Sequence, residues 1–591
     1  MSKLAALQAI KTKRELAELL DVKPSALTYT LYILKPENQY ISFQIPKKSG
    51  GKRTIDAPTG RIKFIQSKLS KLLLDCIDEI NSQKKHLKHK KKTAPTLPQL
   101  SHGFARKRSI ITNAHMHTNQ KNVLNIDLDN FFDCFNFGRV RGFFIKNKNF
   151  NLNDDVATAI AKIACYDNRL PQGSPCSPVI TNLITHSLDI RLAYLAKRYS
   201  CVYSRYADDI TFSTRKPAFP SQLMKESSGA YVVGKRLRRE IESSGFSINR
   251  KKTRIQYKDS RQDVTGLVVN RKPNVKNEYW RTIKAQCHSV FKTGEYFNHT
   301  AEGIYKGTVN ELEGKLNFID QIDLYNRLRQ KPPLEPAYQI AKHNHNTSAL
   351  FSGRERTFSR FLYYRNFYAN SKPTIICEGK TDNVYIKSSI SRLHSDYPKL
   401  AVTDTKTGDY QLLVKLFNYS KRTRFLLELY GGTSYLGLFI SKYNENYSFY
   451  TAPTPSNPVI IILDNDSGAK DILNKISKID STTVYPTSLA KDAYRDSEFI
   501  HVTHNLYIVF TPHIKINDTE IEDFFDKPTR DTLVAGKTFN PKKNFDKTKE
   551  YGKEIFASKV VRANKSSINF DGFKPILDRI TQAIEHYDTL K

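Results

Sequence analysis

The stretch CVYSRYADDITFS, residues Cys201–Ser213, decides the fold of the first half of the chain. Apolar and polar residues alternate on both sides of Asp208 and Asp209, which predicts two β-strands that meet at the two acids. Because successive side chains of a strand point to opposite faces, adjacent acids at a hairpin tip place one carboxylate on each side. An Asp-Asp pair in a turn is common, so its chemistry depends on the other segments that accompany it.

Two earlier segments belong with this hairpin. NVLNIDLDNFFDCF (Asn122–Phe135) predicts an apolar strand that ends at Asp127, and LPQGSPCSPVITNL (Leu170–Leu183) predicts a turn-rich loop that leads into a helix. Polymerases use two divalent ions roughly 3.5–4 Å apart, one at the attacking hydroxyl and one at the leaving pyrophosphate. Carboxylate oxygens are the ligands that Mg²⁺ prefers. The three segments together favour a magnesium-dependent polymerase centre.

Over roughly Ile41–Phe318 the chain resembles reverse transcriptases. The resemblance implies a right-hand α+β polymerase with fingers, palm and thumb, in which Asp127 and Asp208 bind two Mg²⁺ and Asp209 supports them. Phe132 matches the steric gate that rejects a ribonucleotide 2′-OH, so deoxynucleotides (dNTPs) are the expected substrates. The resemblance also assigns nucleotide contacts to Arg53, Lys48 (or Lys47), Phe132, Gln172 and Gly173, and it assigns protonation of pyrophosphate to Lys252, which is otherwise a surface lysine.

Two shorter motifs resemble those of retron reverse transcriptases. Asn113–His117 fits N-A-x-x-H, and Val264–Gly266 fits V-T-G. This resemblance implies a bacterial enzyme that copies part of its own structured non-coding RNA, primed from a guanosine 2′-OH, into branched multicopy single-stranded DNA (msDNA). The residues expected to bind RNA are Asn113, His117, Thr265, Gly266 and Trp280, the last on an expected thumb helix over 277–294. His117 also fits a buried packing histidine.

The composition agrees with a nucleic-acid partner. The chain of 591 residues has 94 Lys+Arg against 58 Asp+Glu, a formal net charge of +36. Such a surplus favours a polyanionic partner, because phosphate binding releases counterions. The basic run KKHLKHKKK (84–92) precedes Pro95 and is expected to be a loop.

Cysteine usage and hydropathy narrow the remaining classes. No apolar run approaches the roughly 18 residues of a membrane-spanning helix, so no membrane partner is expected. The seven Cys are scattered without a C-x-x-C pair, which disfavours a zinc ribbon, a disulfide framework and a group II intron-like endonuclease. We therefore expect a protein of the bacterial cytoplasm.

The second half follows a different pattern. After Pro373, apolar strands alternate with helical stretches, which predicts an α/β unit with a largely parallel sheet. The expected domains are 1–330 for the reverse transcriptase, 331–372 for a connector and 373–591 for the α/β unit.

Two of the apolar strands end in acids. The first ends at Glu378 in E-G-x-x-D, and the second ends at Asp464 in D-x-D-x-G, which includes Asp466. Ligands of α/β sheets collect at the carboxyl ends of the strands, so these three acids are expected to converge as metal ligands.

The paired motifs resemble the TOPRIM domain, in the branch of the overcoming-lysogenization-defect nucleases. The resemblance implies catalytic roles for Glu378, Asp464 and Asp466, a Mg²⁺ or Mn²⁺ cofactor and a nucleic-acid target. Glu520 and Glu522 are candidates for a further metal-binding cluster or for an acidic first turn, and Lys553 is a candidate for stabilising a phosphate. An insertion around Lys421–Tyr450, with Gly431-Gly432, lengthens the interval between the two motifs.

The combined expectation is a retron reverse transcriptase fused to a nuclease effector for anti-phage defence. A homo-oligomer would fit a toxic effector that has to be restrained. The alternatives are a C-terminal domain that senses nucleic acid without cutting it, a group II intron-like mobile-element enzyme, and a replication factor that makes primers.

Overall fold

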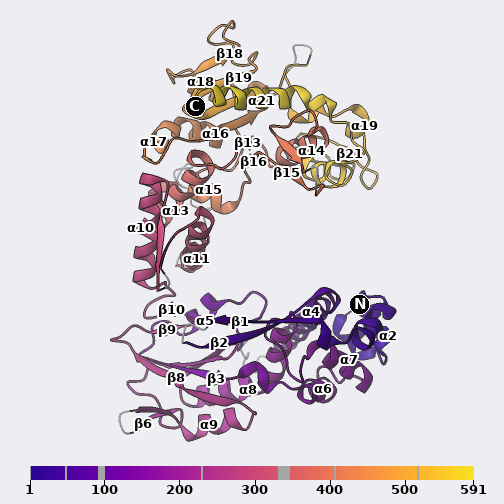
Figure 1. Ribbon diagram of the computed structural model, residues 1–591, viewed down its shortest axis with the longest axis vertical. Coiled ribbons are helices and arrows are strands. Elements are labelled where there is room, and N and C mark those ends of the chain that lie inside the picture. The colour runs from indigo at the N-terminus through magenta and orange to yellow at the C-terminus, as the bar shows by residue number, and fades with distance from the viewer. Residues whose placement is uncertain are drawn as a thin grey trace. The chain divides into compact units, whose positions relative to one another are not determined.

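The computed structural model describes residues 2–46, 50–90, 100–227, 230–301, 303–330, 347–404, 407–514, 518–542 and 544–591. They form two compact units, Met1–Lys276 and Asn277–Lys591 (Figure 1). Within the described ranges, none of the helices combines the length and the apolar character needed to cross a bilayer.

The first unit is built on a four-stranded antiparallel sheet in the order β4-β5-β3-β8. Its strands are β3 (Asn122–Asp129), β4 (Val202–Tyr206), β5 (Asp209–Thr214) and β8 (Ser247–Tyr257). Leu124, Ile126 and Phe212 are fully or almost fully buried in the core, which the alternating pattern of these strands dictates. Helices α5 (Ile110–Met116) and α8 (Ser177–Arg198) pack against β4.

The rest of the first unit surrounds this sheet. A hairpin of β1 (Tyr40–Pro46) and β2 (Lys52–Pro58) precedes the long helix α4 (Gly60–Lys90). Because α4 continues to Lys90, most of the basic run expected as a loop is helical; Lys and Leu are good helix formers, and the nearest Pro lies farther along. The other elements are α1 (Lys3–Ala9), α2 (Lys13–Leu19), α3 (Pro24–Thr28), η1 (Tyr29–Ile33), η2 (Pro36–Gln39), η3 (Phe131–Cys134), α6 (Phe137–Lys146), α7 (Asp154–Ala164), β6 (Met224–Ser227), β7 (Ala230–Val233), α9 (Lys235–Glu242), β9 (Asp263–Val264) and β10 (Leu267–Val268).

The second unit contains a six-stranded sheet in the order β16-β13-β17-β20-β19-β18. The strands are β13 (Thr374–Cys377), β16 (Lys415–Leu416), β17 (Val459–Leu463), β18 (Thr483–Tyr485), β19 (Phe499–Thr503) and β20 (Leu506–Phe510). The first four strands in sheet order are parallel, and β19 pairs antiparallel with both β20 and β18. The largely parallel α/β sheet predicted after Pro373 is therefore present.

Both faces of this sheet are buried, as continuous apolar strands such as β17 require. Ile460 and Tyr507 share a core with α14 (Asp382–Leu393) and α21 (Lys574–Thr589), while Ile461 on the opposite face is also fully buried. Helices α16 (Thr433–Ser441) and α18 (Lys470–Ile476) pack against each other. The buried faces thus leave the carboxyl ends of β13 and β17 as the place for polar side chains.

Helices ahead of the sheet belong to the same unit. The expected thumb helix is α10 (Asn277–Thr293), which packs with α11 (Val309–Arg327) beside a hairpin of β11 (Phe297–Thr300) and β12 (Gly303–Lys306). Residues 331–346 of the expected connector lie outside the described residues. Its described part forms η4 (Thr347–Leu350), α13 (Gly353–Tyr363) and η5 (Tyr364–Tyr368).

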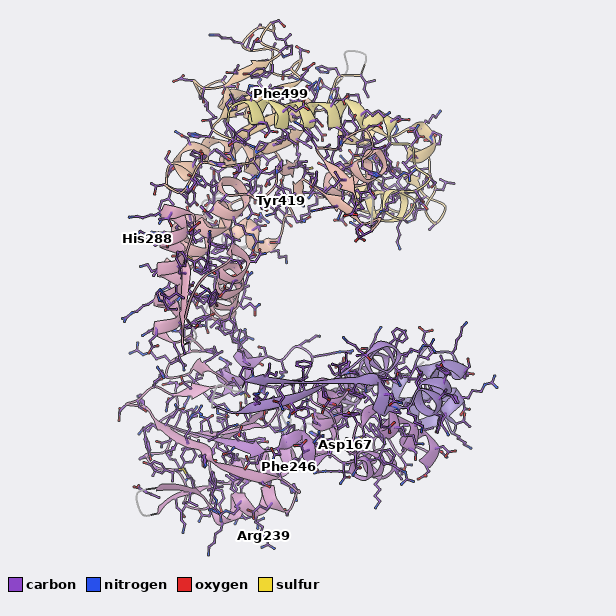
Figure 2. The ribbon with its side chains drawn as sticks, in the orientation of Figure 1. Asp167, Arg239, Phe246, His288, Tyr419 and Phe499 are labelled. Carbon is purple, nitrogen blue, oxygen red and sulfur yellow. The ribbon has the colours of Figure 1, made fainter. Side chains whose placement is uncertain are left out.

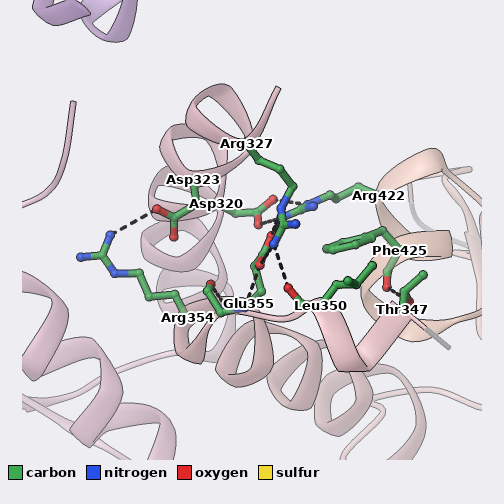
Figure 3. Close-up of polar contacts among 10 residues, drawn as sticks. Asp320, Asp323, Arg327, Thr347, Leu350, Arg354, Glu355, Arg422 and Phe425 are labelled. Carbon is green, nitrogen blue, oxygen red and sulfur yellow. Dashed lines mark hydrogen bonds and ion pairs between the residues drawn. The ribbon is translucent and has the colours of Figure 1, made fainter. Parts of the chain in front are cut away.

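A network of buried charges joins these helices to the sheet region (Figure 3). Arg422 of α15 (Lys421–Leu427) donates to Asp320 of α11 at 2.8 Å and to Glu355 of α13 at 3.3 Å. Arg327 of α11 donates to Glu355 at 2.9 Å and to the carbonyl of Leu350 at 3.1 Å. Two cations thus balance two anions in the interior. Removing one member of such a set typically costs about 3–5 kcal/mol.

This network explains a difference from the sequence-based domain division. The compact units divide after Lys276, whereas the sequence places the end of the polymerase part at residue 330. The buried charge pairs on α11, α13 and α15 make the helices on both sides of the connector one packing unit.

Candidate active sites

The first candidate site lies at the ends of β3 and β5. The β3–β5 register pairs Asp127 with Asp209, and the amide of Leu128 donates to the carbonyl of Asp208 at 3.1 Å. The turn between β4 and β5 therefore holds Asp208 and Asp209 next to the end of β3. The structure brings together the three acids that the sequence singled out.

Lys252 of β8 completes this cluster. Its ammonium nitrogen lies 2.9 Å from Asp127 Oδ1, and that hydrogen bond raises the pKa of Lys252. Burial raises the pKa of Asp208, and the negative charge of Asp127 raises it further. The site is thus a concentration of carboxylates whose mutual repulsion a cation would relieve.

A buried ion pair that the sequence analysis missed positions the acidic turn. Arg205 donates to both oxygens of Asp189 on α8, at 2.7 and 2.8 Å, and also to the carbonyl of Ala207 at 2.9 Å. Arg205 and Asp189 are almost fully buried, and Ala207 has a left-handed φ of 56°. Arg205 therefore fixes the strained residue that precedes Asp208. Only the Arg inside an otherwise apolar and small-residue strand hinted at this role.

The proposed nucleotide-binding segments adjoin one another in part. The amide of Asp56 on β2 donates to the carbonyl of Gln172 at 2.9 Å, so the P-Q-G-S-P loop adds to the β1–β2 hairpin. Arg53 lies on β2, and its charge acts on Asp208. Lys48 and Lys47 lie outside the described residues. The loop and hairpin thus flank the acidic cluster.

Phe132, the expected steric gate, lies on η3 directly after β3. Its ring is half-buried and meets the ring of Phe131 edge-on at 5.5 Å. Phe131 in turn stacks on Phe246 at 5.7 Å, whose place in the unit is labelled in Figure 2. This aromatic packing holds Phe132 near the end of β3 that carries Asp127.

Gly173 has a conformation that other residues rarely adopt. Its φ is +128°, and a Cβ atom there would lie 2.8 Å from the carbonyl oxygen of Asp56. We expect Gly173→Ala to lower the free energy of unfolding by about 1–3 kcal/mol, because backbone strain of this kind has that cost. Urea unfolding followed by circular dichroism measures it. Gly142→Ala on α6, where a Cβ would meet nothing within 4 Å, is the matched control and should lose no stability. Equal stability of the two variants would contradict the expected strain.

The N-A-x-x-H motif lies inside the protein. His117 forms two hydrogen bonds of 2.7 Å, from Nδ1 to the Ser213 hydroxyl and from Nε2 to the Ser204 hydroxyl. The Ser204 hydroxyl donates to the Asn113 side-chain oxygen at 2.6 Å. Asn113 and His117 are fully buried. The expected direct RNA contacts of these two side chains do not fit that burial. Their hydrogen bonds instead connect α5 to β4 and β5, which agrees with the alternative that His117 is a buried packing residue.

The V-T-G motif forms the turn between β9 and β10 next to the same helix. Thr265 Oγ1 donates to the carbonyl of Ile110 at 3.2 Å. Gly266 has a φ of +81°, and a Cβ on it would meet nothing within 4 Å. The two short motifs are thus neighbours in the fold. Trp280 lies on α10 in the second unit, half-buried, with the Arg354 guanidinium 5.5 Å from its ring.

The burial of His117 gives a pH prediction. Burial lowers the pKa of His117 to about 3, below the ordinary value of 6.5. The unfolded chain therefore binds one more proton at this residue between these values, and stability falls as the pH falls through that window, by about 1.4 kcal/mol per pH unit. Unfolding free energies measured from pH 6 to pH 4 should show a slope smaller by about one proton in His117→Gln. His288→Gln, at an exposed histidine (Figure 2), should keep the wild-type slope, and identical slopes in all three proteins would contradict the prediction.

The second candidate site lies at the carboxyl ends of β13 and β17. The amide of Asp464 approaches Glu378 Oε2 at 3.4 Å, and Asp382 accepts from the amide of Gly379 at 2.6 Å. Asp464 also accepts from the amide of Ile521 at 2.9 Å, which draws the segment after β20 to the same place. The two motifs predicted to converge do so, and Asp382 joins them.

Glu522 and Lys553 belong to this cluster as well. Lys553 Nζ lies 3.0 Å from both Glu520 Oε2 and Glu522 Oε2. Glu522 is 2% exposed, and its Oε1 has no hydrogen-bond partner in the described residues. Glu520 begins the turn Ile521–Phe524 and caps it reciprocally with Asp523. Glu520 thus caps the turn, as the alternative for an acidic first turn predicts, whereas Glu522 is close enough for its charge to act on Asp464.

The carboxyl groups of the cluster are unusually hard to ionise. Burial, with the charges of neighbouring acids, raises the pKa of Glu378 and Glu522 to about 7 and that of Asp464 to about 9. Burial also raises the pKa of Asp382. The positive charge of Lys553 offsets part of this repulsion. Asp466 lies at the rim, where it accepts from the amide of Gly468 at 2.8 Å.

Hydrogen bonds to Asn465 fix the loop that carries Asp464 and Asp466. Asn465 is fully buried; Arg495 donates to its side-chain oxygen at 2.6 Å and to its carbonyl at 2.8 Å. The amide of Asn465 donates to Thr511 Oγ1 at 2.9 Å. These contacts fix the backbone on both sides of Asn465 and therefore the directions of Asp464 and Asp466.

The donor sets suit a hard divalent cation, although neither is a complete cage. Within the described ranges, no three His, Cys, Asp or Glu side chains are spaced to hold one ion between them. Mg²⁺ ordinarily keeps several waters and takes one or two carboxylates together with substrate phosphates, so a pair of acids suffices. The unpartnered Oε1 of Glu522 and the raised pKa of Asp464 are the features of the second site that a cation would satisfy.

Comparison with known proteins agrees with the first site. Residues 45–276 match the family described as "Reverse transcriptase (RNA-dependent DNA polymerase)". The first unit is therefore a reverse transcriptase, and the class of enzyme is RNA-directed DNA polymerase.

Relatives identify the branch of that class. The retron Mx65 reverse transcriptase of Myxococcus xanthus is 31% identical over 334 residues, which cover 53% of this chain and 69% of the relative. The retron Ec86 reverse transcriptase of Escherichia coli is 32% identical over 304 residues, which cover 51% of this chain and 81% of the relative. The chain belongs to the retron reverse transcriptases, and these relatives account for about half of its length.

Solved structures add little. The telomerase of Candida albicans, in complex with a fragment of telomeric RNA, is 10% identical, with 55% of this chain and 58% of that chain covered and a TM-score of 0.29. A score this low does not support a shared overall fold.

Proposed function

We propose that the first site copies part of a cognate structured non-coding RNA into branched msDNA, using dNTPs. The observation that carries this is the meeting of Asp127, Asp208 and Asp209 at the β3–β5 ends, with Lys252 at 2.9 Å from Asp127. Membership of the retron reverse transcriptases supports the choice of template and product.

The roles of the residues follow from their chemistry. Asp127 and Asp208, with Asp209 beside them, would hold Mg²⁺, which when bound activates the attacking hydroxyl and stabilises the leaving pyrophosphate. Lys252 carries a proton at the same place and is suited to donate it to pyrophosphate. Gln172 and Gly173 belong to the loop that contacts Asp56 on β2, the strand that carries Arg53, and Phe132 would exclude a 2′-OH from the nucleotide.

The test is reconstitution. The protein purified with its RNA should, on addition of dNTPs and Mg²⁺, make cDNA that debranching enzyme shortens by release of the RNA. Formation of linear cDNA only would keep the polymerase and overturn the 2′-OH priming.

We infer a second activity, metal-dependent cleavage of nucleic acid by a TOPRIM-like site in the α/β unit. It is supported by the convergence of Glu378, Asp382, Asp464 and Glu522 at the carboxyl ends of parallel strands, with Lys553 among them. Mg²⁺ or Mn²⁺ would be held by these acids and would polarise a phosphate. Lys553 would stabilise negative charge on that phosphate.

Two rival functions of the α/β unit give different results. A domain that only senses nucleic acid would bind oligonucleotides but leave them intact in Mn²⁺. The wild-type and Asp464→Ala proteins would then give the same result in a cleavage assay. A primer-making domain would synthesise RNA from ribonucleotides on a template. The site favours cleavage over sensing, because a binding surface gains nothing from burying four carboxyl groups with raised pKa values.

The two activities in one chain suit anti-phage defence in the bacterial cytoplasm. In that arrangement the RNA–DNA product restrains the effector until infection disturbs it. Co-expression of the RNA with the wild-type protein should permit growth, and infection or loss of the RNA should stop growth; growth arrest independent of Glu378 would overturn this role. A homo-oligomer would provide more contacts through which the RNA–DNA product restrains the nuclease. Light scattering of the RNA-bound protein measures the oligomeric state.

A further inference from the structure

A group of positive side chains lies beside the acidic cluster of the second site, which consists of Glu378, Asp382, Asp464 and Glu522. Lys380 follows Glu378 by two residues, and Lys421 and Arg424 come from α15. Lys380 Nζ lies 2.7 Å from Tyr430 Oη and 4.0 Å from the centre of its ring, and Arg424 Cζ lies 4.9 Å from the same ring centre. The charge of Lys421 also reaches Tyr430. We call Lys380, Lys421, Arg424 and Tyr430 the cationic patch.

The patch is fastened to the acidic cluster by the backbone of the insertion. The amide of Gly432 donates to the carbonyl of Glu378 at 2.9 Å, and a Cβ on Gly431 would lie 2.6 Å from the same oxygen. Tyr419, labelled in Figure 2, donates to the carbonyl of Cys377 at 2.6 Å. The insertion around Lys421–Tyr450, which lengthens the interval between the two acidic motifs, therefore forms one wall of the site.

The positive charge of the patch is not neutralised by the protein. In the described part of the chain, none of the three cations forms an ion pair with an Asp or Glu, whereas Lys553 pairs with two. Arg424 instead donates to the hydroxyl of Tyr435 at 2.6 Å, a neutral partner. Aromatic rings hold the ammonium and guanidinium groups in place and leave their charge uncompensated. An anion is the complementary ligand.

We propose that the cationic patch binds the phosphate backbone of the polynucleotide strand beside the phosphate that is cleaved at the acidic cluster. The backbone from Glu378 to Lys380 spans at most about 7 Å, so a strand at the acids passes the patch within a nucleotide or two. The substrate is thus a strand of several nucleotides, not a mononucleotide or pyrophosphate. This inference rests on the proposed nuclease function and adds the class of substrate to it.

Lysine footprinting tests the patch without any cleavage. Full-length Asp464→Asn protein, with or without a saturating 12-nucleotide single-stranded DNA or RNA, is treated with an acetylating reagent, and peptides are mapped by mass spectrometry. Lys380 should be acetylated at least about fivefold more slowly with one of the oligonucleotides. Lys478 should be unaffected, because it follows α18 at the end of the sheet opposite the acids.

Unchanged acetylation of Lys380 at a saturating concentration of both oligonucleotides would overturn the proposal. Equal protection by inorganic phosphate at the same phosphate concentration would overturn the assignment to a strand.

Cleavage kinetics give the second test. On the oligonucleotide that the wild type cuts, the double variant Lys380→Gln/Arg424→Gln should raise KM about tenfold or more with little change in kcat. Its dependence of log KM on log salt should be flatter by about 1.4, since each single-strand phosphate contact contributes roughly 0.7. Lys478→Gln, an exposed lysine with the same charge change, should match the wild type.

The outcomes separate the two proposals. Protection of Lys380 without cleavage by the wild-type protein would support the patch and defeat the nuclease. Cleavage by a double variant with wild-type KM and salt slope would defeat the patch and leave the nuclease standing.

Discussion

Asp208→Asn is expected to lower the rate of cDNA synthesis by about a thousandfold or more. The substitution preserves shape but removes the charge that a divalent ion requires, and loss of several kcal/mol of transition-state stabilisation corresponds to such a factor. Because Asp208 already sits beside Asp127 in a half-buried site, Asn relieves repulsion rather than creating it, and the fold should survive.

The measurement is cDNA synthesis on the co-purified RNA without an added primer, with the product resolved on a gel. Asp259→Asn, at an exposed turn after β8, is the matched control and should retain wild-type synthesis. RNA retained on purification and an unchanged circular dichroism spectrum exclude misfolding. Synthesis by Asp208→Asn within tenfold of the wild type would remove the assignment of the polymerase site.

Asp464→Asn should abolish both cleavage and toxicity while making the metal-free protein more stable at pH 7. The pKa of Asp464 is raised to about 9 in the fold, against an ordinary 3.8, so its proton is bound in the folded chain and released on unfolding at pH 7. A raised acid pKa contributes stability at low pH that is lost as the pH rises from the ordinary value toward the folded value. Asn mimics the neutral carboxyl and removes that loss.

Loss of activity with a gain in stability distinguishes this result from misfolding. Thermal unfolding with and without Mn²⁺ should show a larger shift in the wild type than in the variant, which keeps only the metal site at Asp127 and Asp208. Asp471→Asn, exposed on the first turn of α18, is the control for the same chemical change and should behave like the wild type in every assay. A toxic Asp464→Asn protein would contradict the assignment of the second site.

Much of both sites could be predicted because local patterns set them. Period-two alternation around Asp208 predicts the β4–β5 hairpin, and apolar strands ending at Glu378 and Asp464 predict acids at one edge of a parallel sheet. In each case the residue lies within a few positions of the element that orients it, so spacing alone carries the information.

Other features depended on contacts across the sequence. Arg205 pairs with Asp189 on another element, and although an Arg inside a largely apolar strand suggests a buried partner, the sequence does not identify that partner. His117 fits a family motif equally well as a binding residue or as a packing residue, and only its two serine partners decide for packing. Glu522 and Lys553 are candidates only through the family resemblance, because no periodicity specifies the paths of the segments that bring them to the acids.

The buried charge network has a consequence for how such proteins diversify. Asp320 and Arg327 lie before residue 330, in the part of the sequence assigned to the polymerase. Their partners Arg422 and Glu355 lie after residue 330. A recombination breakpoint at residue 330 would separate the partners of both pairs and leave unpaired charges in the interior of each recombinant protein. Grafts of the α/β unit onto other polymerases should therefore succeed when the splice falls at residue 276 and carries α10 and α11 along, and they should aggregate when it falls at residue 330.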